Sequence, residues 1–132
     1  MSQKRQSGFT VLELIVVVVF LVAAGTIFYV QKRDLQIEKG DSQRKTAINA
    51  IYYDLEEVFY FANKAYPEKL LSDQLKGIDP ALLIDPNNVA VGDQKSQYHY
   101  EPKDCKDGLC KSYKLWADMV HEPTYTKPSR NQ

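Results

Sequence analysis

The residues from Phe9 to Val30 form a nearly uninterrupted apolar run, and this run limits the possible folds more than any other feature of the sequence. The run holds 22 residues, and Glu13 is its one charged side chain. About 20 mostly apolar residues, at roughly 1.5 Å each in a helix, cross the hydrocarbon of a bilayer. We therefore expect a transmembrane helix over residues 9–30.

A cleaved secretory signal is the alternative interpretation of the same run. Such a signal has a shorter apolar core that is followed by small residues at the cleavage site. The nearest match here is Ala23-Ala24-Gly25, inside a run that continues to Val30. The pattern therefore favours a helix that is retained.

The remaining length allows one small soluble domain, because the chain has 132 residues in all. Lys plus Arg and Asp plus Glu are balanced at 17 each, so no net field draws the chain onto nucleic acid or anionic lipid. Lys4 and Arg5 precede the apolar run, and their removal with residues 1–8 would leave 15 basic against 17 acidic side chains.

Cys105 and Cys110 are the only cysteines, and they enclose the sequence KDGL. These four residues are typical of a turn with glycine at the tight position. Two thiols cannot complete a four-ligand zinc site, and neither His99 nor His121 lies at ligand spacing from them. We expect a disulfide, and the alternative is two free thiols.

The expected disulfide also decides the membrane orientation. The numbers of basic residues on the two sides of the apolar run are nearly equal, so the positive-inside rule alone does not decide the orientation. A disulfide persists outside the reducing cytoplasm. The C-terminal domain is therefore expected outside the cytoplasm, with residues 1–8 inside.

Residues 31–66 are expected to continue the helix as an amphipathic segment. Apolar residues recur at helical spacing on one side, and polar residues lie opposite them. The apolar stripe comprises Ile48, Ile51, Tyr52, Leu55, Phe59 and Ala62, and the polar face comprises Lys45, Asn49, Glu56 and Asn63. Pro67 disfavours helical geometry at Tyr66, so we expect the helix to stop there.

Residues 67–132 are expected to form the small extracytoplasmic domain. PEKLLSDQL predicts two helical turns that bury its leucines, and DPALL predicts a helix start with Asp79 as N-cap and Pro80 in the first position. SQYHYE and KSYKLWADMV alternate, which predicts a hairpin around the cysteine loop. HEPTYTKPSRNQ is expected to fray. The predicted fold class is α+β, with one long N-terminal helix packed on a small antiparallel sheet.

The stretch SGFTVLELIVVVVFLV resembles the N-terminus of the type IV pilin and pseudopilin family. In that family a short basic leader ends in glycine, here Gly8, and a glutamate, here Glu13, is the fifth residue after the break. The match covers about the first 30 residues. It implies that residues 1–8 are a leader, that prepilin peptidase cuts after Gly8, and that the new amine of Phe9 is methylated. The alternative is a plain signal anchor that keeps residues 1–8.

The resemblance also gives Glu13 a role. A carboxylate near the middle of a lipid-exposed helix costs about 2.5 to 3.5 kcal/mol, and less near the interface. In the family this glutamate pairs with the N-terminal amine, here that of Phe9, of its own chain or of a neighbour in the filament core. The alternative is that Glu13 lies near the headgroups and stays solvated.

The function that the resemblance implies is that of a structural subunit in a helical filament. The implied partners are further copies of the chain, other pilins, prepilin peptidase, a membrane platform protein with its assembly ATPase, and membrane lipid before assembly. The implied location is the cytoplasmic membrane before assembly, and an extracellular pilus or cell-envelope filament after it.

The alternative function is a binding module displayed at a tip or on the membrane, for DNA uptake, adhesion or secretion. Cations and aromatic rings mix in residues 95–116, and such a mixture can bind single-stranded DNA. The aromatic rings can equally belong to the core. The cations are Lys95, Lys103, Lys106, Lys111 and Lys114, and the rings are Tyr98, Tyr100, Tyr113 and Trp116.

The sequence gives only weak indications of a metal site and none of enzyme activity. Oxygen ligands gather in one loop as a weak calcium candidate, although turn formation explains the same residues and no EF-hand pattern is present. These residues are Asp85, Asn87, Asn88 and Asp93. A site using both His99 and His121 is a weaker candidate. The sequence has no nucleophile motif, glycine-rich phosphate loop or CxxC pair, so we expect no enzyme activity and no cofactor.

Overall fold

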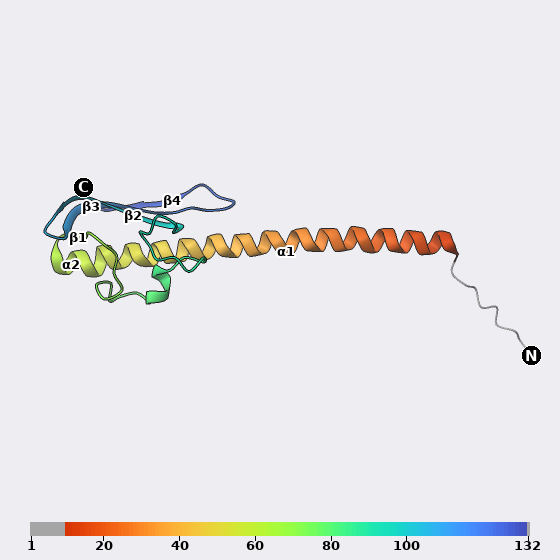
Figure 1. Ribbon diagram of the computed structural model, residues 1–132, viewed down its shortest axis with the longest axis horizontal. Coiled ribbons are helices and arrows are strands. Elements are labelled where there is room, and N and C mark those ends of the chain that lie inside the picture. Colours follow the sequence, from red (N-terminus) through yellow and green to blue (C-terminus); the bar gives the residue numbers. More distant parts are fainter. Residues whose placement is uncertain (1–9, 132) are drawn as a thin grey trace, which may run out of the picture. The chain divides into compact units, whose positions relative to one another are not determined.

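The computed structural model describes residues 10–131 and divides the chain into two compact units, Met1–Gln36 and Ile37–Gln132. The described part of the first unit is almost entirely helical. The second unit contains the rest of the helix, a sheet and the segments that connect them (Figure 1).

The long helix begins at α1 (Val11–Tyr53) and continues through a π-helical segment, η1 (Asp54–Phe59), and a final turn, α2 (Tyr60–Asn63). Neither Gly25 nor Gly40 interrupts it. The prediction of one long N-terminal helix is therefore confirmed.

The helix ends at Asn63, and the prediction that it extends to Tyr66 is wrong. Lys64 adopts the left-handed conformation, with φ of 53°, and its amide donates to the carbonyl oxygen of Tyr60 at 2.8 Å. This cap turns the chain before Pro67 is reached. Tyr66 and Pro67 then form the short strand β1 (Tyr66–Pro67).

The π-helical segment η1 explains why the predicted polar face of the helix is wrong at one position. Glu56 was expected in solvent, yet it is only 6% exposed. A π-turn holds more residues than the 3.6 of an α-turn, so side chains after Tyr53 rotate away from the positions that an α-helical pattern gives. Ile48, Ile51 and Leu55 are fully buried as predicted, whereas Ala62 is exposed.

The sheet is antiparallel, and its central strand is β3 (Leu109–Ala117). β2 (Tyr98–Lys106) pairs along one edge of β3. β1 and β4 (Tyr125–Pro128) pair with different parts of the other edge. The predicted α+β class, a long helix packed on a small antiparallel sheet, is confirmed.

The predicted hairpin is present, with longer strands than expected. β2 and β3 include both cysteines, and the connection between them shortens to Asp107 and Gly108. These two residues have φ of 54° and 80°. Positive φ at both positions is typical of a two-residue hairpin turn, and it favours Asp-Gly.

The prediction that the C-terminal stretch frays is wrong. Tyr125 and Thr126 pair with Ala117 and Trp116 of β3, and Ser129 is buried. The amide of Ser129 donates to the carbonyl oxygen of Tyr113 at 3.0 Å. Of the two prolines in this stretch, Pro123 precedes β4 and Pro128 is its last residue, and an edge strand such as β4 tolerates a proline.

The core of the second unit lies between the helix and one face of the sheet, and the connection between β1 and β2 adds Leu75, Leu83 and Val91 to it. It consists of Ala47, Ile48, Ile51, Leu55, Tyr66, Leu75, Leu83, Val91, Tyr98, Tyr113, Leu115 and Ala117. The alternation of β3 places three of these residues inward at every second position. Tyr98 and Tyr113 of the hairpin therefore belong to the core, and Tyr100 packs against it.

The connection between β1 and β2 is mostly irregular. The predicted helical turns in PEKLLSDQL are absent: a single turn joins Leu71 and Gln74, and Leu71 is exposed while Leu75 is buried. The predicted cap at Asp79 is confirmed, since its Oδ1 accepts from the amide of Ala81 at 2.9 Å. That cap begins the 3-10 helix η2 (Pro80–Leu83).

Candidate functional site

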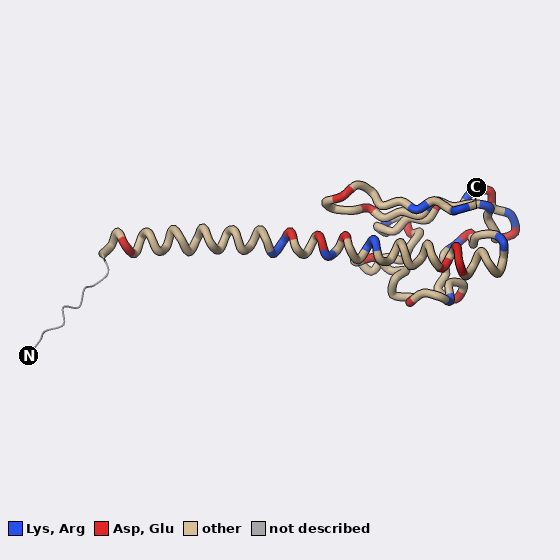
Figure 2. The backbone as a smooth tube through the Cα atoms, turned by 180° about the vertical axis from the view of Figure 1, so that it is seen from behind, with Lys and Arg blue, Asp and Glu red and all other residues tan. Residues whose placement is uncertain are grey.

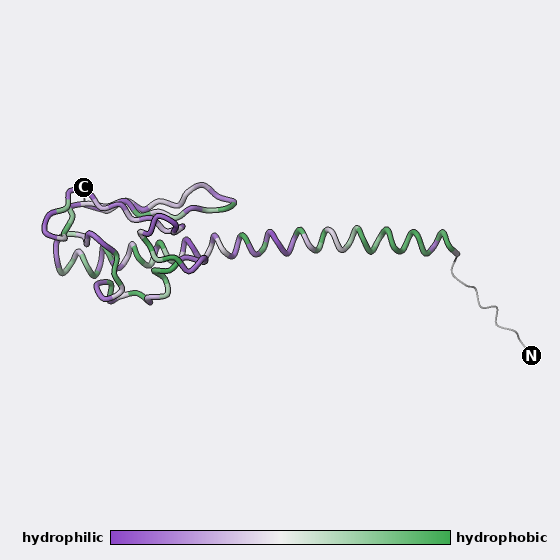
Figure 3. The backbone as a smooth tube through the Cα atoms, viewed as in Figure 1, coloured by the Kyte–Doolittle hydropathy of each residue, from purple (hydrophilic) through white to green (hydrophobic). Residues whose placement is uncertain are grey.

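The apolar half of α1 is the first candidate functional surface. Its large apolar side chains between Val11 and Val22 are 44% to 76% exposed. Between Glu13 and Lys32 the helix carries no charged side chain, and hydropathy is highest along this stretch (Figures 2 and 3). Within residues 10–131, this is the one helix long and apolar enough to cross a membrane.

Glu13 lies in the first turn of that helix. Thr10 precedes the helix, and its Oγ1 accepts from the amide of Glu13 at 3.3 Å. Thr10 and Glu13 therefore occupy the N-cap and N3 positions of the helix, and a carboxylate in this first turn interacts favourably with the helix dipole. The predicted cleavage and methylation at Gly8 and Phe9 lie outside the described residues.

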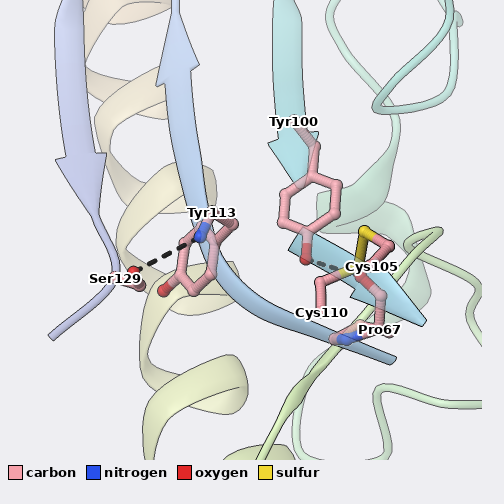
Figure 4. The surroundings of a disulfide bond; sticks show 6 residues. All are labelled: Pro67, Tyr100, Cys105, Cys110, Tyr113 and Ser129. Atoms are coloured by element: carbon pink, nitrogen blue, oxygen red, sulfur yellow. Dashed lines mark hydrogen bonds between the residues drawn. A yellow bond between two sulfur atoms is a disulfide. The ribbon is translucent and has the colours of Figure 1, made fainter. Parts of the chain in front are cut away.

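The predicted disulfide between Cys105 and Cys110 is present, and no free cysteine occurs among the described residues. The two cysteines are directly opposite each other in β2 and β3. Beside them, the hydroxyl of Tyr100 donates to the carbonyl oxygen of Pro67 at 2.7 Å (Figure 4). The disulfide thus closes the hairpin at the end where β1 joins the sheet.

Glu56 forms a buried hydrogen-bond cluster that the sequence did not indicate. Its carboxylate accepts from the hydroxyls of Tyr113 at 2.8 Å and Tyr66 at 3.0 Å, and from the amide of Arg130 at 3.1 Å. Burial raises the pKa of Tyr66 to about 12. Burial, followed by Glu56, also raises the pKa of Tyr113. The cluster joins the helix, β1, β3 and the C-terminal segment.

Asp41 forms a second buried cluster in the second unit. Its oxygens accept from the amides of Val120 and His121, each at 3.0 Å, and from Nη1 of Arg44 at 2.8 Å. Burial alone would raise the pKa of Asp41, but these three donors together bring it below the ordinary value. Nothing in the helical periodicity distinguishes this aspartate from its solvent-exposed neighbours.

In the loop considered as a weak calcium candidate, the two carboxylates accept hydrogen bonds from backbone amides and so stabilise turns. Oδ1 of Asp85 accepts from the amides of Asn87 and Val89, and Oδ2 accepts from the amide of Gln97 at 2.8 Å. Burial would raise the pKa of Asp85, but the three amides lower it overall. Asn88 adopts a positive φ of 62° in this turn.

Asp93 also caps a turn, because its Oδ1 accepts from the amide of Lys95. In the described part of the chain, no group of three or more His, Cys, Asp or Glu side chains could bind a metal ion.

The two histidines have separate environments. His99 lies on β2, stacks on Trp116 with ring centroids 5.0 Å apart, and contacts Oδ2 of Asp118 at 2.8 Å. His121 follows β3, and its amide donates to Asp41.

The rings considered for DNA binding are mostly internal. Tyr98 and Tyr113 are each 2% exposed, and Tyr100 is half-buried against the core. Trp116 remains partly exposed, with Nζ of Lys114 5.1 Å from its ring centroid. A row of free rings, on which successive bases could stack, is therefore missing from residues 95–116.

Comparison of the chain with protein families, with curated proteins and with solved structures finds no match.

Proposed function

We propose that this chain is a structural subunit of a type IV pilus or a related filament, assembled through its N-terminal helix. The observation that carries the proposal is the exposed apolar surface of α1, which has Glu13 as its one carboxylate between Val11 and Val30. Such a surface is stable in lipid or against other apolar helices, not in water. A filament subunit that is first inserted in the membrane has this surface in contact with lipid, and after assembly in contact with the apolar helices of other subunits.

The proposed assembly begins with removal of residues 1–8, as the resemblance to prepilins implies. The amine of Phe9 then lies four residues before Glu13. The capping bond from Thr10 supports a helix that starts close to this amine. An ammonium from a neighbouring chain would offset the desolvation of the Glu13 carboxylate when helices pack in the filament core.

The second unit is suited to an exposed position on such a filament. Its hairpin is closed by a disulfide, which favours a location outside the reducing cytoplasm. Its C-terminal strand is fixed by β3 and by the Glu56 cluster. Subunits that repeat by a head-to-tail contact form an open helical fibre, and the second unit of each copy would cover its outside.

The proposal is tested by mass spectrometry of filaments sheared from the cell surface. The chain is expected as a main component that begins at Phe9 and carries one added methyl group. A Gly8→Leu variant is expected to stay uncut, and Ser7→Ala serves as the matched control. Assembled protein that still begins at Met1, or filaments that lack this chain, would contradict the proposal.

A further inference from the structure

The end of the apolar stretch of α1 carries two basic side chains that the fold does not use. Lys32 and Arg33 are the first charged residues after Glu13, and both are exposed. Neither takes part in an ion pair within residues 10–131. No acidic residue lies three or four positions before or after either of them, so the helix itself offers no carboxylate within reach. Both charges are therefore accessible to a group outside the chain.

The spacing along the helix places these two residues at a membrane boundary. Lys32 lies 19 positions after Glu13 in α1, which is about 28 Å at the rise of an α-helix. The hydrocarbon of a bilayer is about 30 Å thick. When the apolar stretch crosses a bilayer, Lys32 and Arg33 therefore lie at the level of the lipid headgroups, at the end opposite to Glu13.

Two aromatic side chains mark the same boundary. Phe28 and Tyr29 lie four positions before Lys32 and Arg33, so each ring shares a face of the helix with one of the basic residues. Both aromatic residues are 70% exposed. Tyrosine is enriched at membrane interfaces, where its ring is in contact with lipid and its hydroxyl with water and headgroups. Helix side chains lean toward the N-terminus, so the alkyl stems of the two basic residues extend over these rings while their charges stay at the headgroups.

The two positive charges select one class of headgroup. A zwitterionic headgroup is neutral overall, whereas an anionic headgroup attracts each nearby basic side chain by about fivefold in affinity, which corresponds to about 1 kcal/mol. Asp34 follows Arg33 directly and opposes this attraction. Its short side chain lies about 100° around the helix from Arg33, so it reduces the attraction without cancelling it.

We propose that Lys32 and Arg33 bind the phosphate groups of anionic phospholipids at the membrane surface, with Phe28 and Tyr29 in the interface beside them. This inference rests on the membrane-inserted state of the proposed function, and not on the filament. The bound headgroups hold the apolar stretch at one depth in the bilayer. A chain that leaves the membrane has to break these contacts.

The test uses the full chain in phosphatidylcholine bicelles, into which phosphatidylglycerol is titrated. The reporters are the ¹H–¹⁵N NMR signals of the Arg33 side chain at Nε and of the Lys32 amide. These reporters are local, so Lys4 and Arg5 at the other end of the apolar run do not contribute to them. We expect a saturable shift of both signals, smaller at high salt, and no shift of the Nε signal of the buried Arg44. No shift at Lys32 and Arg33 would overturn the site.

Matched variants locate the groups that bind. Lys32→Gln, followed at Arg33, should raise the half-saturating fraction of phosphatidylglycerol by about fivefold, and Asp34→Asn should lower it. Lys39→Gln is the control, since Lys39 is also exposed and outside the ion pairs of the described residues. It lies seven positions beyond Lys32 in α1, which is about one Debye length, so its replacement should have little effect. Equal effects of Lys39→Gln and Lys32→Gln would overturn the assignment to the boundary residues.

Free phosphate is the other source of the same ligand chemistry. Potassium phosphate added to bicelles of phosphatidylcholine alone is expected to leave both signals where potassium chloride of equal ionic strength leaves them. A saturable shift with free phosphate as large as that with phosphatidylglycerol would overturn the choice of a lipid. The measurement is made on single chains, so a failure to form filaments would contradict the proposed function alone. The absence of a shift with phosphatidylglycerol would overturn the headgroup site alone.

Discussion

The hydroxyl of Tyr113 donates a hydrogen bond of 2.8 Å to the carboxylate of Glu56, across the interface between β3 and the π-helical segment. The two residues are 57 positions apart in the chain. Tyr66 and the amide of Arg130 reach the same carboxylate. One side chain therefore joins the first strand, the central strand and the C-terminal segment to the helix.

We expect Glu56→Ala to destabilise the second unit by about 3 kcal/mol or more, because the buried hydroxyls of Tyr66 and Tyr113 and the partly buried amide of Arg130 lose their acceptor. Tyr113→Phe removes one donor and leaves the carboxylate two others, so a cost of about 1 kcal/mol is expected. Thermal and denaturant unfolding of the two variants measure the difference. An equal loss of unfolding free energy in the two variants would mean that the cluster does not act through the shared carboxylate.

Asp85 is expected to stabilise the fold in a pH-dependent way. Its folded pKa lies below the ordinary value, so its ionised form contributes stability above the unfolded pKa of about 3.9. That contribution is lost as the pH falls through the folded pKa. Asp85→Asn should therefore lower the melting temperature at pH 7 and have a progressively smaller effect below about pH 4. A difference that is independent of pH would contradict this assignment.

Cys105→Ser is expected to cost about 3 kcal/mol or less, because the disulfide closes a short loop and restricts the unfolded chain only moderately. The hairpin should persist, since its register is also fixed by the Asp107-Gly108 turn and by the inward residues of β3. Hydrogen exchange should increase at the disulfide end of the hairpin first. Complete loss of the β2–β3 pairing in the variant would show that the disulfide determines the fold.

Gly77 is expected to resist substitution because of Asp54. A Cβ atom at this position would lie 2.1 Å from Oδ1 of Asp54, and 3.2 Å from Cγ2 of Val58. Gly77→Ala should cost about 1 to 3 kcal/mol, as overpacking does in other cores. In an Asp54→Ala background the same change should cost less than half as much, which a double-mutant cycle measures. If the destabilising effects of Gly77→Ala and Asp54→Ala are additive, the contact between the new Cβ atom and Asp54 is not the cause.

The features that were predicted from sequence depend on periodicity and on local turn chemistry. The apolar run, the fully buried Ile48 and Leu55, the Asp79 cap and the Asp-Gly hairpin each follow from a few neighbouring residues. The disulfide was predicted because few other roles suit two cysteines so close together.

The features that were missed depend on contacts between distant parts of the chain. The left-handed cap at Lys64 and the π-helical segment change the path of the helix, and the sequence carries no local signal for either. Glu56 and Asp41 are buried because amides and hydroxyls from strands and loops far along the chain reach them. The helical periodicity placed Glu56 on the polar face, and the sequence analysis made no prediction for Asp41. The C-terminal segment was mispredicted for the same reason, because its pairing with β3, which includes Pro128, is a contact between distant parts of the chain.

Glu13 is expected to contribute to assembly more than to membrane insertion. Glu13→Leu removes a carboxylate from an apolar helix, so the single chain should insert at an equal or higher level. Filament yield should fall, because two opposite charges about 4 Å apart at an effective dielectric near 20 attract by about 4 kcal/mol before desolvation is subtracted. Glu13→Gln keeps the shape, and it should also assemble poorly if the charge guides docking.

Thr10→Val is the control for this prediction, since it removes the capping oxygen that accepts from the amide of Glu13 and leaves the carboxylate in place. Its effect on filament yield should be smaller than that of either Glu13 variant. Cleavage and methylation at Phe9 are measured in the same strains, so that a failure of processing is distinguished from a failure of docking. Normal filaments from a Glu13→Leu chain that is cut and inserted at the usual level would remove the assembly role, and would leave Glu13 with its favourable interaction with the helix dipole.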